Sequence, residues 1–106
     1  MAELLTNNIN VLFTLNADVD GVRRSLGNSA YRPNHKFVGT TETFIGFVEF
    51  ENGECLPGQT VSAKIKVIYP AYLSNKFVTS SEWEVLEGIS NQVGKVTITS
   101  IGANET

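Results

Sequence analysis

The stretch TVSAKIKVIYP, residues 60–70, decides the fold class because its apolar and polar residues alternate with a period of two. One set of alternate positions holds Val61, Ala63, Ile65, Val67 and Tyr69, and the other holds Ser62, Lys64, Lys66 and Ile68. Successive side chains of a strand point to opposite faces, so this pattern is typical of a strand with one face on a core. We therefore expect Val61, Ile65 and Val67 to lie in that core.

The same period recurs along most of the chain. The other extended segments are INVLFTL (9–15), HKFVG (35–39), FIGFVEF (44–50), EWEVLEG (82–88) and QVGKVTITSI (92–101). Here Val85, Val96 and Ile98 are expected in the core, and Gly46, between Phe44 and the bulky Phe47 and Val48, marks a bulge or a close approach of two segments. About six strands joined by turns rich in Gly, Asn, Asp, Pro and Ser predict an all-β domain, either a barrel or a sandwich.

The length and charge of the chain indicate one globular domain and argue against binding along a nucleic-acid backbone. The chain has 106 residues, 42% of them hydrophobic and 18% charged, which is enough for one compact core. Its net charge is −3, and its longest basic run is the pair Arg23-Arg24, so no footprint for a long nucleic-acid backbone is visible.

The cysteine count and the N-terminal residues indicate the cellular compartment of the protein. Cys55 is the only cysteine, which excludes an internal disulfide or a thiolate-rich metal site and fits a reducing compartment. The first residues carry no positively charged leader, and no run of about 20 apolar residues could span a bilayer. We predict a cytoplasmic protein that does not bind a membrane.

Residues that could carry chemistry are few. His35 and Cys55 each occur once, without a third group placed by a recognisable motif, and both are interpreted as structural. The glutamates around residues 49–54 and 82–87 alternate outward at strand spacing, as solvated faces do. The loop around Leu56-Pro57-Gly58 lacks the Lys-Ser/Thr ending of a phosphate loop. We expect no catalysis, no cofactor, no metal and no nucleotide.

Several short motifs occur together in a characteristic order. They are Tyr31-Arg32-Pro33, Thr40-Thr41-Glu42, Leu56-Pro57-Gly58 before the long strand ending in Pro70, and Glu87-Gly88 shortly before Val93-Gly94. In order and spacing they resemble the C-terminal domain, domain 3, of translation elongation factor Tu. The resemblance implies a single six-stranded antiparallel β-barrel over residues 8–102, with a lead-in at 1–7 and a flexible tail at 103–106. It also implies a domain without catalytic residues, because GTP binding belongs to another domain of that family.

The resemblance also suggests an RNA-binding surface. The family's domain holds the T stem of aminoacyl-tRNA through a Gln after Tyr-Arg-Pro, a Thr at the next turn and a Glu-Gly pair, and here Asn34, Glu87 and Gly88 occupy such positions. The family's basic residue before Glu-Gly is Leu86 in this chain, its Gly-Gly-Arg continuation is Gly88-Ile89-Ser90, and Phe44 or Ile45 replaces the Thr. The interpretation of Asn34, Glu87 and Gly88 as turn formers is favoured over RNA contact.

Three functions remain open at this point. The first is a stand-alone barrel that docks on a protein partner, with Tyr72, Leu73 and Phe77 of the long 71–82 loop as anchors or as a lid over the barrel end. The second is contact with tRNA or another RNA in translation. Its candidate residues are Arg23, Arg24, Arg32, Asn34, Glu87 and Gly88, with Lys95 as a further phosphate contact. The third is a domain remnant without independent activity.

Overall fold

The computed structural model describes residues 3–25 and 30–101, whose regular secondary structure is almost entirely β-strand. Its elements are β1 (Leu4–Leu15), β2 (Arg23–Arg24), β3 (Asn34–Phe37), β4 (Phe44–Phe50), β5 (Glu54–Cys55), β6 (Thr60–Pro70), the 3₁₀ helix η1 (Ala71–Lys76), β7 (Glu82–Glu87) and β8 (Asn91–Ile101). Within the described residues no helix has the length and apolar character needed to cross a membrane.

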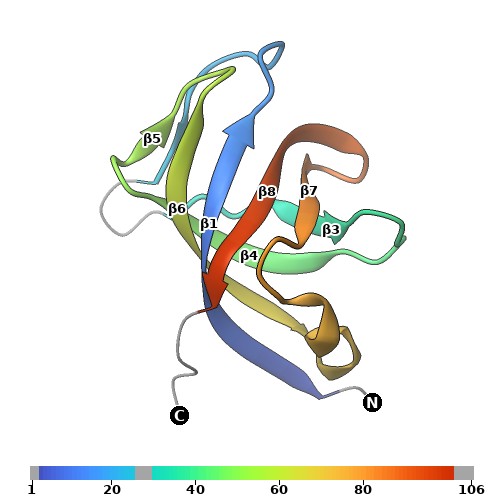
Figure 1. Ribbon diagram of the computed structural model, residues 1–106. Helices are drawn as coiled ribbons and strands as arrows, with labels where there is room; N and C mark the ends of the chain where they lie inside the picture. The colour runs from blue at the N-terminus through green and yellow to red at the C-terminus, as the bar shows by residue number, and fades with distance from the viewer. Residues whose placement is uncertain (1–2, 26–29, 102–106) are drawn as a thin grey trace.

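Six of these strands close into an antiparallel barrel in the order β1-β6-β4-β3-β7-β8, with β8 pairing back onto β1. Figure 1 shows the long strands β1, β6 and β8 bending around the barrel, with the short β5 beside one end of β6. β2 and β5 pair as a separate two-stranded sheet. Closure leaves every barrel strand with two neighbours, which removes the exposed edges of an open sheet. The predicted six-stranded antiparallel barrel is confirmed.

The first strand is longer than the sequence pattern indicates. β1 begins at Leu4, which pairs with Pro70, so residues 4–7 belong to the barrel and the expected lead-in at 1–7 is too long. Asn7 occupies an inward position between Leu5 and Ile9, which breaks the apolar alternation, and its amide donates to the Tyr69 hydroxyl at 2.8 Å. At the other end β8 stops at Ile101, and the predicted tail at 103–106 lies outside the described residues.

The core is built from the inward faces of all six strands. Ile65, Val67, Val85, Val96 and Ile98 are each at most 1% exposed, as predicted. Val61 is only partly buried and packs against the rim of this core. Phe47, expected with Phe44 and Val48 to supply bulk around Gly46, has the outward parity of β4 instead and is half-buried.

Aromatic side chains fill the end of the barrel beneath η1. Phe37, Phe44, Phe77 and Trp83 contact one another with ring centroids 5.0–5.9 Å apart, mostly edge to face. Phe77 is 6% exposed and Leu73 of η1 is 7% exposed, so both close the barrel end as a lid. The prediction that Leu73 and Phe77 are surface anchors for a partner is therefore wrong, because both side chains are buried in the apolar end of the barrel.

His35 lies at the centre of this aromatic region and is fully buried. Trp83 Nε1 donates to His35 Nδ1 at 2.8 Å, which leaves the proton on Nε2, 3.2 Å from the carbonyl oxygen of Gly46. Both ring nitrogens are thus satisfied by the neutral imidazole. Burial lowers the pKa of His35 from 6.5 to about 4. This geometry makes His35 a structural residue that holds β3, β4 and β7 together.

Candidate functional site

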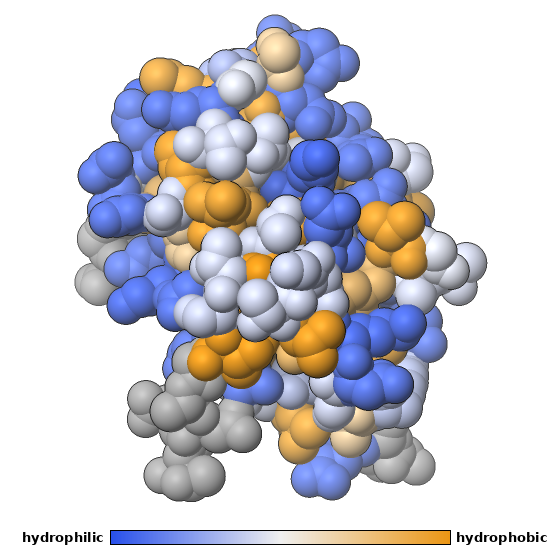
Figure 2. Space-filling view, viewed as in Figure 1, coloured by the Kyte–Doolittle hydropathy of each residue, from blue (hydrophilic) through white to orange (hydrophobic). Residues whose placement is uncertain are grey.

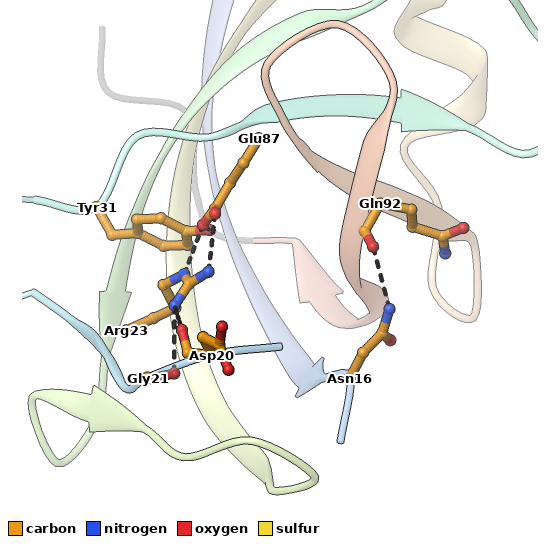
Figure 3. A network of polar contacts seen from close by, with 7 residues as sticks. All are labelled: Asn16, Asp20, Gly21, Arg23, Tyr31, Glu87 and Gln92. Carbon is orange, nitrogen blue, oxygen red and sulfur yellow. Dashed lines mark hydrogen bonds and ion pairs between the residues drawn. The ribbon is translucent and has the colours of Figure 1, made fainter. Parts of the chain in front are cut away.

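Four of the residues predicted to bind RNA meet in one polar cluster, which we call the hairpin cluster. It consists of Arg23, Tyr31, Asn34, Glu87 and Gly88. The cluster forms because β7 ends at Glu87 beside the start of β3, and because β2 places Arg23 against the same carboxylate. In Figure 3 the side chains of Arg23 and Tyr31 converge on Glu87.

The Arg23–Glu87 contact is a two-pronged ion pair. Arg23 Nε lies 2.5 Å from Glu87 Oε2, and its terminal nitrogen lies 2.8 Å from Oε1. The other terminal nitrogen donates to the carbonyl oxygens of Asp20 at 3.0 Å and Gly21 at 3.2 Å (Figure 3). Each of the three guanidinium nitrogens of Arg23 therefore already donates to a partner in the protein.

The electrostatics of the hairpin cluster follow from this pairing. The hydrogen bonds from Arg23 lower the pKa of Glu87, and the same contact raises the pKa of Arg23. Burial, followed by the hydrogen bond to the Glu87 carboxylate, raises the pKa of Tyr31. The Tyr31 hydroxyl donates to Glu87, so its phenol stays protonated across the physiological range. The cluster holds one cation and one anion and carries no net charge.

A tight turn fixes the loop between β7 and β8. Asn34 Nδ2 donates to the carbonyl oxygen of Gly88 at 3.0 Å, and Gly88 adopts a φ of +79°, which favours glycine. Ile89 at the tip is 95% exposed, and Leu86, in the position of the family's basic residue, is 4% exposed. The turn-forming interpretation of Asn34 and Gly88 accounts for these contacts.

The other predicted cations lie outside the hairpin cluster. Arg24 is paired with Glu54 at 3.5 Å on the β2–β5 ribbon. Arg32 lies over the Phe47 ring, with its Cζ atom 6.0 Å from the ring centroid. Lys95 is exposed on β8, opposite Glu84 of β7. The structure therefore does not gather the predicted basic residues onto one RNA-binding face.

A second surface lies on the outward side of β1, β6 and β4, and we call it the outer strip. Cross-strand pairing places Ile45 opposite Ile68, and Leu4 opposite Pro70. These residues, with Phe47 and Tyr72, make up the outer strip: Leu4, Ile45, Phe47, Ile68, Pro70 and Tyr72. Leu4 is 65% exposed, Ile45 43% and Tyr72 54%, whereas the other three are half-buried.

The two ends of the outer strip have polar borders. At the η1 end the Tyr72 hydroxyl donates to Glu42, which precedes β4. At the other end Glu49 stands opposite Lys64, and a hollow of about 470 Å³ begins there, lined by polar side chains that include Glu51 and Ser62. By contrast, on the face over which β1 and β8 run, Figure 2 shows hydrophobic residues as separate small groups among polar ones.

Of the predicted partner-binding residues only Tyr72 is on the surface. The register between β4 and β6 brings Ile45 and Ile68 together, and no local sequence pattern predicts that contact. The sequence indicates the outer strip at one position: within residues 60–70, Ile68 shares the outward set of alternate positions with polar residues. The contact of Tyr31 with Glu87 in the hairpin cluster likewise depends on the pairing of β3 with β7, which no local sequence pattern predicts.

Cys55, the remaining candidate for a reactive residue, lies in the interior. Cys55 is fully buried, its thiol faces the carbonyl oxygen of Gln59 at 3.4 Å, and burial raises the pKa of that thiol. In the part of the chain that the structure describes, no three His, Cys, Asp or Glu side chains come together as a metal site would require.

Comparison of the sequence with models of known protein families gives no match. Comparison with curated proteins gives no significant match either. The assignment of a function therefore rests on the two surfaces described above.

Proposed function

We propose that this barrel is a non-catalytic binding module that docks on a protein partner through the outer strip. We further propose that it is a homologue of domain 3 of elongation factor Tu, on the motifs around Tyr31-Arg32-Pro33, Leu56-Pro57-Gly58 and Glu87-Gly88. The observation that carries the docking proposal is the pair formed by Ile45 and Ile68 on the outside of the barrel, which Leu4, Phe47 and Tyr72 extend.

The outer strip has the features of an interface. Single apolar residues are common on protein surfaces, but contiguous ones bordered by polar residues mark interaction sites. Strands position these side chains, so little conformational entropy is lost when a partner covers them. Tyr72 and Phe47 supply the aromatic surface that binding hot spots favour.

RNA binding is the second candidate, favoured by the convergence of Asn34, Glu87 and Gly88. Three observations count against it. The Arg23 guanidinium is bonded to Glu87 and to backbone carbonyls, Arg24 is paired with Glu54, and an exposed Ile89 occupies the hairpin tip. Affinity for RNA depends on free cations that neutralise phosphates, and the hairpin cluster offers none.

Affinity capture of the tagged protein from its own cells tests the proposal. The capture is carried out at low and at moderate salt, with and without nuclease. We expect a defined polypeptide that survives nuclease treatment and moderate salt, because apolar contacts are weakly screened. Recovery of RNA that is lost steeply as salt rises would overturn the proposal in favour of the second candidate.

A further inference from the structure

Two cations border the outer strip in one cross-strand row. The pairs Asn34–Ile45 and Tyr31–Val48 place Arg32 opposite Phe47, and Phe47 is directly opposite Lys66 of β6. Adjacent strands are about 4.8 Å apart, so the Cα atoms of Arg32 and Lys66 are roughly 10 Å apart with the aromatic ring between them. Arg32 is held over that ring at 6.0 Å from its centroid.

In the described part of the chain, neither of these cations has an acidic partner. Among residues 3–25 and 30–101, Arg23, Arg24 and Lys36 each form an ion pair, whereas Arg32 and Lys66, like Lys64, Lys76 and Lys95, form none. The next row holds Glu49 opposite Lys64 and is balanced, and the Glu42 carboxylate at the far end accepts the Tyr72 hydroxyl. The centre of the outer strip is therefore positive, although the protein as a whole carries a charge of −3.

We infer that the outer strip recognises an acidic, amphipathic protein segment, in which Asp or Glu side chains flank large apolar residues. This inference rests on the proposed function and names the partner's chemistry. The apolar side chains of the segment would cover Ile45, Phe47 and Ile68, while its carboxylates meet Arg32 and Lys66. Bringing opposite charges together across an interface steers association and selects partners.

A second copy of this chain does not fit the same surface as well. A symmetric dimer buries the same patch of both molecules, so the two Arg32 side chains and the two Lys66 side chains would come close together. No carboxylate stands in their row to neutralise them. A partner with the opposite charge removes this repulsion, whereas self-association does not.

The test is an NMR titration of the full-length, ¹⁵N-labelled protein with two synthetic peptides. Both peptides carry Leu and Phe at the same positions, and the positions between them are Glu in one peptide and Lys in the other. We expect the Glu peptide to shift the amide resonances of Ile45, Phe47 and Ile68, and the Lys peptide to bind at least about tenfold more weakly.

Charge-reversal variants sharpen this test. Arg32→Glu and Lys66→Glu should each weaken binding of the Glu peptide by about tenfold, whereas Lys95→Glu on β8 makes the same change in net charge and should leave it unaltered. Circular dichroism and melting temperature confirm that each variant is folded.

The possible outcomes separate the inference from the proposed function. Equal binding of both peptides at the outer strip would overturn the charge selectivity and leave protein docking intact. Shifts elsewhere on the barrel, or none with either peptide, would also overturn the inference. If oligouridine shifts the outer-strip resonances and neither peptide does, then the inference and the proposed function are both wrong.

Discussion

Gly46 faces His35 so closely that a methyl group on its Cα would lie 2.5 Å from the imidazole Nε2. That nitrogen is also within 3.2 Å of the Gly46 carbonyl oxygen, and the ring is fully buried. The close approach of β4 to His35 therefore requires glycine at position 46. The sequence predicts either such a close approach or a bulge at this glycine. Its register with β6 is regular, so Gly46 marks a close approach and does not form a bulge.

Gly46→Ala should reduce the free energy of unfolding by about 1–3 kcal/mol, because the added methyl overpacks a filled core. Urea denaturation measures this loss. Combined with His35→Ala, the same substitution should cost less, since the two nearest contacts, both with the imidazole, are removed while that with Ile65 Cγ2 at 2.9 Å remains. Equal costs in both backgrounds would contradict the packing described here.

The buried His35 predicts a pH dependence of stability. Its pKa is about 4 in the folded protein against 6.5 for an ordinary histidine, so between these values the unfolded chain binds a proton that the folded protein does not. Stability should fall by about 3 kcal/mol as pH drops from 6.5 to 4, and this contribution should level off below pH 4.

His35→Gln provides the control for that measurement. His35 is the only histidine in the chain, so the variant should lose the part of the slope between pH 6.5 and 4 that comes from the imidazole and keep the part that carboxylates contribute below pH 4.5. The structural role of His35 and Cys55 further predicts that His35→Gln and Cys55→Ser leave partner binding essentially unchanged if the variants fold. Loss of binding by a folded variant would reopen the question of chemistry at either residue.

Glu87→Gln separates a structural Glu87 from an RNA-contacting one. Because Arg23 lowers the pKa of Glu87, the ion pair contributes stability above pH 4.5 that is lost as pH falls further. The variant should be about 1 kcal/mol less stable at neutral pH and should lose this acid dependence. Its affinity for a T-stem RNA hairpin, measured by fluorescence anisotropy, should not fall, since Arg23 is released from its anionic partner. A clear drop in that affinity would indicate a direct role for Glu87.

A matched pair of isoleucines tests the inward and outward assignments. Ile65 is fully buried on β6, so Ile65→Ala should cost about 2–5 kcal/mol through lost burial and a cavity. Ile45 is 43% exposed on β4, and Ile45→Ala should cost less than about 1 kcal/mol. Similar losses in both variants, measured by denaturant unfolding, would mean that one of the faces is misassigned.

The barrel strands could be predicted from the sequence because each has one buried face, and alternation records that burial. The exception is the start of β1, where the inward Asn7 bonds to Tyr69 and interrupts the pattern. The roles of Leu73 and Phe77 could not be predicted, since an apolar residue in a loop looks the same whether it closes a barrel end or faces a partner. The outer strip is hidden for a different reason, because Ile45 and Ile68 meet only through the register of β4 and β6.

Site-specific photo-cross-linking in the protein's own cells tests the central claim most directly. A photoreactive amino acid replaces Ile45 in the outer strip or, as the matched control, the exposed Ile89 beside the hairpin cluster. If the barrel docks on a protein through the outer strip, the probe at position 45 gives a discrete polypeptide adduct that protease removes and nuclease does not, and the probe at position 89 gives little. RNA adducts at position 89, with no polypeptide adduct at position 45, would contradict the account.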